Sequence, residues 1–151
     1  MKQGVKYIIE SELNLLKERI ISNHLSAGQR ASGKTAASLN VMAEADFVSL
    51  LGRKAIGTLE TGRKAGPVPK NFYLIIKQWS KDKGLTFESE SQRGTFAYFV
   101  AKKIAEEGTD LFIQGGRNDI YSNEIPVTIN KIAERITERF TMEITNIQIN
   151  K

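Results

Sequence analysis

Apolar residues recur every three or four positions along four stretches of the chain, which is the spacing of one face of an α-helix. The spacing predicts amphipathic helices over residues 5–25, 70–83, 94–107 and 125–143. Glycines at positions 28, 84 and 108 follow the first three stretches, as expected of residues that end helices. In chain order, the positions expected to face the core are Val5, Ile8, Ile9, Leu13, Leu16, Ile20, Phe72, Ile75, Ile76, Trp79, Phe96, Phe99, Val100, Ile104, Ile129, Ile132, Ile136 and Phe140.

The apolar spacing changes between the first two of these helices. The segment SLNVMAEADFVSLLG (residues 38–52) predicts a pair of strands that turn near Glu44. Residues 109–123 are predicted to be extended around a Gly115–Gly116 turn, and the alternating tail ITNIQIN to form a short strand. No internal repeat or linker interrupts the sequence. We therefore expect one α+β domain, residues 1–151, with about four amphipathic helices packed on a small antiparallel β-sheet.

Composition removes several classes of function. The 151 residues are 40% apolar and 26% charged, which is typical of one globular domain. The chain has no cysteine, which excludes disulfides, thiolate–zinc sites and cysteine nucleophiles, and a single histidine, His24, excludes a two-histidine metal motif. No apolar run reaches 18 residues and the N-terminus lacks the apolar stretch of a signal peptide, so we expect a cytoplasmic protein without membrane contact. No metal or cofactor is expected.

The net charge of +5 comes almost entirely from residues 53–70. That stretch is rich in glycine and contains Pro67 and Pro69, so we expect an exposed loop. It contains no aromatic residue, which argues against a stacking platform for single-stranded nucleic acid. Two interpretations stay open: a solvated loop that keeps the protein soluble, or a contact with phosphate backbone or an acidic protein surface. The charged residues of the stretch are Arg53, Lys54, Arg63, Lys64 and Lys70, against Glu60.

Residues 28–35 (GQRASGKT) match the phosphate-binding pattern G-x-x-x-x-G-K-[ST] in full. Such a loop requires a buried strand before it and a helix that starts at the lysine, because the backbone amides between them hold the phosphates. Here the preceding residues are the end of a predicted helix, and the following ones are extended or mixed. The match therefore favours a polar turn, with a small nucleotide-binding enzyme as the alternative.

No other group of residues suggests catalysis. Glu106 and Glu107 would point about 100° apart on a helix and cannot converge as an acid–base pair. Glu88 and Glu90 lie in an exposed connection, and His24 is expected to be a surface or helix-capping residue. We therefore do not expect an enzyme.

Three segments, taken in order, resemble one protein family. The segment SGKTAASLNV resembles a T/S-G-x-L/T-x-x-S-L/I stretch that leads into the first strands. LETGRKAGPVPKNFYLIIKQWSKDKGL is similar to E-x-G-R-x-P-G-x-x-P followed by a helix ending W-x-x-x-K-G, and FAYFVAKKIAEEGTDLF to A-Y-x-I-A-x-K-I-x-x-x-G-T. These are motifs of the tail-completion, or neck, family of tailed bacteriophages. The resemblance covers residues 32–121, with Ala65 where the family commonly has proline.

The resemblance implies a structural virion protein without catalysis. Members form a ring, six- or twelvefold, that joins the portal-capped head to the tail around the DNA channel. The implied partners are further copies of the chain, the portal or an adjacent neck or tail ring, and channel DNA in a non-specific contact. Its place would be the neck or the tail of the virion, after assembly in the cytoplasm of the bacterial host. A nucleic-acid-binding module that uses the basic loop 53–70 is a further alternative.

The resemblance also assigns roles within the basic stretch. Arg63 would form a forked contact with a carboxylate of the next subunit or ring. Gly33, Lys34 and Thr35 would belong to the motif that leads into the strand rather than to a phosphate site. The motif residues expected to shape the loop are Glu60, Gly62, Arg63, Gly66 and Pro69. The residues expected at the interface are Arg53, Lys54, Glu60, Arg63, Lys64 and Lys70.

Overall fold

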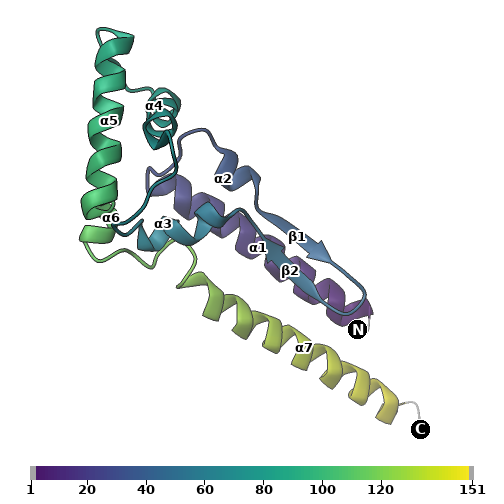
Figure 1. The fold of residues 1–151 in the computed structure, drawn as a ribbon. Coiled ribbons are helices and arrows are strands. Elements are labelled where there is room, and N and C mark those ends of the chain that lie inside the picture. Colours follow the sequence, from purple (N-terminus) through teal and green to yellow (C-terminus); the bar gives the residue numbers. More distant parts are fainter. Residues whose placement is uncertain (1–2, 150–151) are drawn as a thin grey trace.

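The structure, a computed structural model, describes residues 3–149 of the chain (Figure 1). Four helices in this range are longer than four residues: α1, α4, α5 and α7. In chain order the elements are α1 (Gln3–Ser26), α2 (Lys34–Ala37), β1 (Asn40–Ala43), β2 (Val48–Leu51), the 3-10 helix η1 (Lys54–Gly57), α3 (Thr58–Thr61), α4 (Phe72–Asp82), α5 (Glu90–Glu107), α6 (Asp110–Ile113) and α7 (Glu124–Ile149). The four helices predicted from the apolar spacing are thus present, close to their predicted positions.

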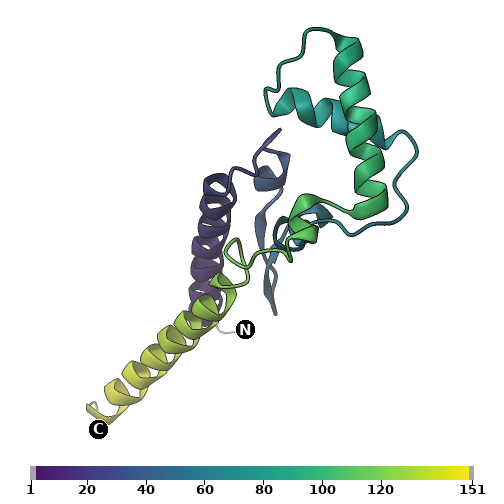
Figure 2. The same cartoon turned by 90° about the vertical axis from the view of Figure 1, so that its left-hand side faces the viewer.

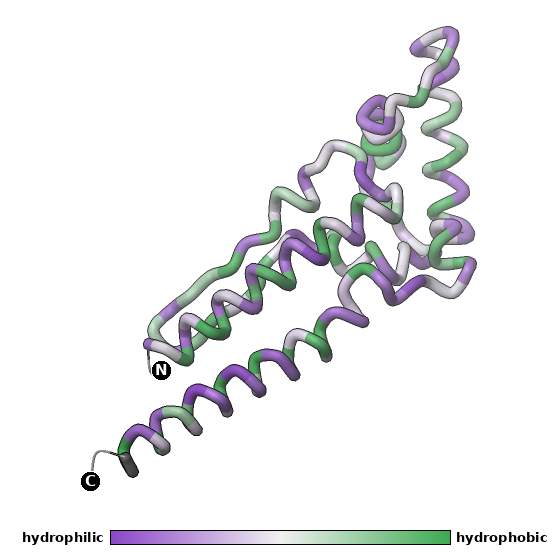
Figure 3. Tube along the Cα trace, turned by 180° about the vertical axis from the view of Figure 1, so that it is seen from behind, coloured by the Kyte–Doolittle hydropathy of each residue, from purple (hydrophilic) through white to green (hydrophobic). Residues whose placement is uncertain are grey.

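Helix α1 lies between the β1–β2 ribbon and α7 (Figures 1 and 3). Helices α4 and α5 pack against each other and form a separate pair at the end of the molecule where α1 finishes. The C-terminal end of α7 points to the opposite end of the molecule (Figure 2). The chain is therefore elongated, with the α4–α5 pair and the end of α7 far apart.

The ribbon confirms the predicted strand pair. Strands β1 and β2 are antiparallel, with Asn40 opposite Leu51 and Ala43 opposite Val48. The backbone N–H of Glu44 donates to the carbonyl of Phe47 at 2.9 Å and closes the turn where the sequence predicts it. One face of this short ribbon packs on α1, which is the only long helix in close contact with both strands.

The hydrophobic core is small and divided in two. One cluster consists of Leu16, Ile20 and Ile120, and it joins α1 to the segment before α7. The other consists of Ile76, Ala97 and Ala101, where α4 packs on α5. Because the two clusters lie in different parts of an elongated chain, much of the apolar surface of the described residues stays exposed.

The predicted fold class, four helices packed on an antiparallel sheet, is wrong. The described chain is mostly helical, with seven α-helices, and its sheet is a single two-stranded ribbon. A two-stranded ribbon offers too little surface for four helices, so α4 and α5 pack on each other instead. The chain is rich in α-helix with a small sheet.

Three local predictions also need correction. Residues 110–113 form the one-turn helix α6, although Gly115 and Gly116 do make the predicted turn, with φ of 88° and 79°. Residues 54–61 of the basic stretch form η1 and α3 rather than loop. The tail from Ile144 to Ile149 continues α7, because no glycine or proline interrupts it and its apolar residues also fit helical spacing. Asn150, the last residue of the predicted strand, lies outside the described residues.

Side-chain burial differs from the predicted stripes on three helices. Trp79 and Ile75 of α4 are 38% and 54% exposed, and Phe99 of α5 is 62% exposed, although all three are predicted to face the core. Ile129 and Phe140 of α7, also predicted to face the core, are 59% and 36% exposed. The small residues Ala97 and Ala101 occupy the centre of the α4–α5 contact instead. Alanines allow two helices to approach closely, so they displace the larger side chains from the contact.

Candidate interaction surfaces

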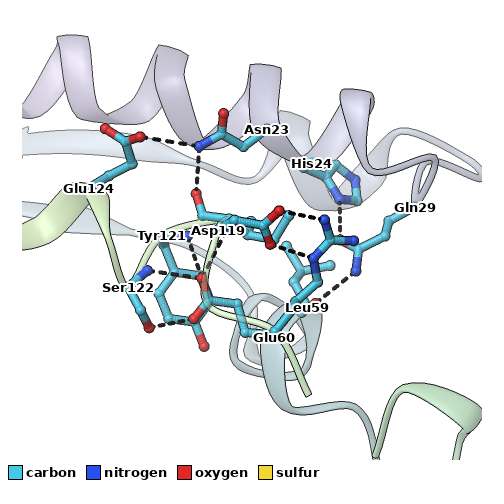
Figure 4. A network of polar contacts seen from close by, with 11 residues as sticks. Asn23, His24, Gln29, Leu59, Glu60, Asp119, Tyr121, Ser122 and Glu124 are labelled. Carbon is cyan, nitrogen blue, oxygen red and sulfur yellow. Dashed lines mark hydrogen bonds and ion pairs between the residues drawn. The ribbon is translucent and has the colours of Figure 1, made fainter. Parts of the chain in front are cut away.

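A buried carboxylate organises the middle of the molecule (Figure 4). Glu60 on α3 is 3% exposed. Its Oε1 atom accepts hydrogen bonds from the backbone N–H groups of Ile120 (2.9 Å), Tyr121 (2.7 Å) and Ser122 (2.9 Å), and its Oε2 atom accepts one from the Ser122 hydroxyl. The carbonyl of Glu60 also accepts from the N–H of Arg117 at 2.8 Å. Glu60 therefore connects α3 to the whole segment that leads into α7.

These contacts set the charge of Glu60. Burial raises the pKa of Glu60, but the hydrogen bonds from the Ser122 side chain and from the backbone of Ser122, Tyr121 and Ile120 lower it by more. The net pKa lies below the ordinary value, so the group is ionised at neutral pH. Glu60 is predicted from the basic stretch to lie at an interface, whereas its side chain is buried and bonds within the chain.

Two of the motifs that carry the family resemblance meet in space. The N–H of Arg63 donates to the Thr109 hydroxyl at 2.9 Å, and the N–H of Thr109 donates to the Arg63 carbonyl at 2.8 Å. Lys64 pairs with Gly108 in an isolated bridge, and the N–H of Gly66 donates to Ala105 at 2.9 Å. The G-R segment and the G-T segment are thus joined along their backbones.

The guanidinium of Arg63 is also used inside the chain. Its Nη2 donates to the Pro67 carbonyl at 2.5 Å, and the group lies over the Phe72 ring at 5.6 Å. Arg63 therefore holds the turn between α3 and α4 in shape, which fits the predicted loop-shaping role. Its side chain is only partly exposed.

The other basic residues of the stretch are exposed but divided between two places. Arg53 and Lys54 lie at the start of η1, while Lys64 and Lys70 lie in the connection between α3 and α4. The intervening helices and the buried Glu60 separate the two pairs along the chain. The stretch is therefore not one continuous basic loop.

The phosphate-binding pattern lies in a different context from the one that it requires. Residues 28–33 follow α1, where a phosphate-binding loop follows a strand. A helix does begin at Lys34, as the pattern requires and contrary to the extended or mixed structure expected there, but this helix, α2, has only four residues. The Lys83 ammonium group donates to the Gly28 carbonyl and ties this segment to the end of α4. The helix that precedes the pattern is the one that the apolar spacing predicts.

A groove lies between this segment and α4, and we name it the α4 groove. It has a volume of about 680 Å³. Leu59, Leu74, Ile75 and Trp79 form its apolar wall, and Lys34 and Arg53 are among its polar lining residues.

His24 lies at the end of α1 beside the groove. Contrary to expectation it is only 4% exposed. Its Nδ1 atom contacts Gln29 Oε1 at 3.3 Å, and Gln29 Nε2 donates to the Leu59 carbonyl at 2.7 Å. These contacts connect α1 to α3, so His24 has a structural role in holding the two helices together.

Glu90 belongs to the α4–α5 pair. The Lys77 and Lys81 ammonium groups, at 3.1 and 3.2 Å, hold the pKa of Glu90 at about 2. This carboxylate therefore links the two helices from the solvent side. Glu88, which the sequence places near it, accepts from the Gln92 side chain at 2.8 Å instead.

A polar contact between α1 and α7 was missed in the sequence. Glu12 is 3% exposed and pairs with Arg135 at 2.7 Å, and Arg19 pairs with Glu124 at 2.8 Å and with the Thr128 hydroxyl at 2.7 Å. The sequence does contain an indication of this contact: Glu12 is a charged residue on the apolar face of α1, between Ile8 and Leu16.

Comparison with known proteins gave no match among family models, curated proteins or solved structures. Within residues 3–149, no group of three or more metal-ligating side chains could hold a metal ion. Over the same residues, no helix combines the length and the apolar character needed to cross a bilayer.

Proposed function

We propose that the chain is a structural virion protein of a tailed bacteriophage, a ring-forming head–tail connector or tail-completion subunit. Copies of it would join the portal-capped head to the tail around the DNA channel, without catalysis. We infer the class of protein from the resemblance of residues 32–121 to the neck family. We infer that the chain binds partners from the large surface that a single copy leaves exposed.

That surface is the observation on which the proposal depends. The accessible surface of the chain is 10093 Å². A folded monomer of 16.9 kDa exposes about 7,700 Å², so the chain exposes about 2,400 Å² more than its mass requires. This excess corresponds to two contact faces of about 1,200 Å² each, so a contact between two copies would bury about 2,400 Å² in total, in the range of large, permanent interfaces. A ring subunit has two such faces, one for each neighbour.

The excess surface is rich in large apolar side chains. In the described residues, 21 large hydrophobic side chains are exposed, against seven buried hydrophobic residues in the core. Scattered apolar residues are normal on a monomer, but a surplus of this size is typical of a protein that buries them against partners. The exposed pairs Arg53–Lys54 and Lys64–Lys70 would then contact an adjacent acidic ring or channel DNA.

The meeting of the two motifs supports the resemblance. Chance similarity to loose patterns gives no reason for Arg63 and Thr109 to exchange hydrogen bonds across 46 positions of sequence. If both motifs are required by one fold, their residues are expected to lie in contact. The two alternatives, a nucleotide-binding enzyme and a nucleic-acid-binding module, receive less support, because the phosphate-binding pattern lacks its strand and the basic residues are divided.

The proposal is tested on virions of the phage that encodes the chain. Immunogold labelling against this protein should place gold at the head–tail junction, and deletion of its gene should yield filled heads and separate tails. Restoring the gene in trans should restore joined particles, which serves as the control. Labelling elsewhere, or intact particles without the protein, would contradict the proposed function.

A further inference from the structure

Helix α7 turns a polar face toward α1. The residues that contact α1 are Glu124, Thr128 and Arg135, which bond to Arg19 and Glu12. Further along, Arg139, Met142 and Asn146 lie beside Gly4 and Tyr7 near the start of α1. These bonds between the two helices are therefore polar, and Ile132 and Ile136, which lie beside them on α7, are only partly exposed.

The apolar side chains of α7 lie on another face, which we name the outer stripe: Ile129, Ile144 and Ile147. They are 59%, 58% and 62% exposed. At 100° per residue, Ile129 and Ile147 lie about 100° around the helix from Thr128 at the centre of the polar face. Ile144 lies about 160° around the helix from Thr128. Apolar residues recur along the whole helix (Figure 3), yet no core cluster of the described chain includes them. Three exposed isoleucines in register on a long helix form a surface suited to another protein.

The α4 groove, like the outer stripe, has exposed apolar side chains. Its wall residues Leu74, Ile75 and Trp79 are 48%, 54% and 38% exposed. An open, apolar groove beside a helix is the shape that receives the apolar stripe of another helix. Within one chain the two surfaces cannot meet, because the end of α7 points away from α4 (Figure 2).

We propose that the outer stripe of α7 in one copy of the chain packs into the α4 groove of the next copy. This inference rests on the proposed function and specifies its subunit contact. Two different surfaces at opposite ends of a subunit make a head-to-tail contact, which repeats from copy to copy and closes into a ring when the rotation permits. The excess of about 2,400 Å² is large enough for two such faces, one for each neighbour.

Two variants test the contact from its two sides in the full chain. Ile144→Glu places a charge on the stripe, and Ile75→Glu places one in the groove. Each should weaken self-association about a hundredfold or more, because a carboxylate without a partner is strongly disfavoured in an apolar contact. Sedimentation velocity over a series from about 0.1 to 100 μM protein should show both variants assembling only at concentrations about a hundredfold above those at which the wild-type chain assembles.

Mixing the two variants distinguishes this contact from a symmetric one. Ile144→Glu keeps an intact groove and Ile75→Glu keeps an intact stripe, so the mixture has one working contact per pair. It should form heterodimers and nothing larger. A stripe that packed on a second stripe would leave Ile75→Glu assembled as in the wild type, and that result would overturn the proposal.

Matched controls lie two residues away on the same helices. Met142 is 64% exposed but lies on the α1 side of α7, and Tyr73 of α4 lines a different depression with Tyr98. Met142→Glu and Tyr73→Glu should assemble like the wild type. Circular dichroism verifies folding of every variant, and Ile147→Glu and Leu74→Glu repeat the test at second positions.

The outcomes separate this inference from the proposed function. A monomeric wild type, assembled stripe and groove variants, or a mixture without heterodimers overturns the contact. If Ile75→Glu assembles like the wild type while Ile144→Glu does not, the groove is not the binding site of the stripe, and it would bind a different protein or a small molecule. If the contact passes these tests but virions carry no label at the neck, the contact stands and the proposed function fails.

Discussion

Replacing Glu60 with glutamine is expected to destabilise the chain by about 2–4 kcal/mol. The amide oxygen can still accept from the N–H groups of Ile120, Tyr121 and Ser122, but it carries no negative charge, so these buried charge-assisted hydrogen bonds become weaker neutral ones. For a domain of this size, that cost corresponds to a melting temperature lower by roughly 6–12 °C. Thermal denaturation at one fixed protein concentration measures it, since assembly makes the melting temperature depend on concentration.

The effect should also depend on pH in a defined direction. The folded-state pKa of Glu60 is lowered, so its contribution is complete above the unfolded-state pKa and is lost as the pH falls through the folded value. The difference between wild type and Glu60→Gln should therefore narrow below about pH 4. Glu106→Gln is the control, because Glu106 is exposed and has only a distant ion pair with Lys102 at 3.9 Å. An equal loss of stability in Glu60→Gln and Glu106→Gln would contradict the structural role of Glu60.

Replacing Gly62 with alanine is expected to cost about 3 kcal/mol. The backbone there has φ 67° and ψ −169°, a conformation that is strained for any residue with a side chain. An added Cβ would lie 2.5 Å from the Phe112 nitrogen and 2.6 Å from the Thr109 hydroxyl. Both the strain and the contact oppose the close approach of α3 to α6, and a melting temperature lower by roughly 6–12 °C should result.

Gly57→Ala is the matched control for this change. Gly57 lies five residues earlier in the same segment, has an ordinary φ of −60°, and an added Cβ would meet nothing within 4 Å. That variant should melt close to the wild type or slightly above it. A Gly62→Ala chain as stable as Gly57→Ala would show that the α3–α6 approach is not required.

Local pattern predicted the elements of this fold better than their arrangement. Helical spacing located α1, α4, α5 and α7, and the change of period located the ribbon, because both depend on neighbouring residues alone. The pattern treated every apolar stripe as core. It therefore missed that Ala97 and Ala101 bring α4 and α5 together and leave Trp79 and Phe99 outside.

The candidate site was predicted in part for a similar reason. The charge excess identified Arg53, Lys54, Lys64 and Lys70, which are exposed as expected. It could not show that Glu60 is buried, since its partners are backbone groups about 60 positions away. Contacts with distant backbone groups cannot be recognised from the local sequence. The buried Glu12 could have been recognised, because it is a charged residue on the apolar face of α1.

The central claim is that copies of this chain close into a ring, and imaging the purified full-length protein by electron microscopy tests it most directly. The account predicts class averages of closed rings with one copy number and a central opening that accommodates duplex DNA. Monomers or open filaments at every concentration, alone and mixed with the portal of the same phage, would contradict it.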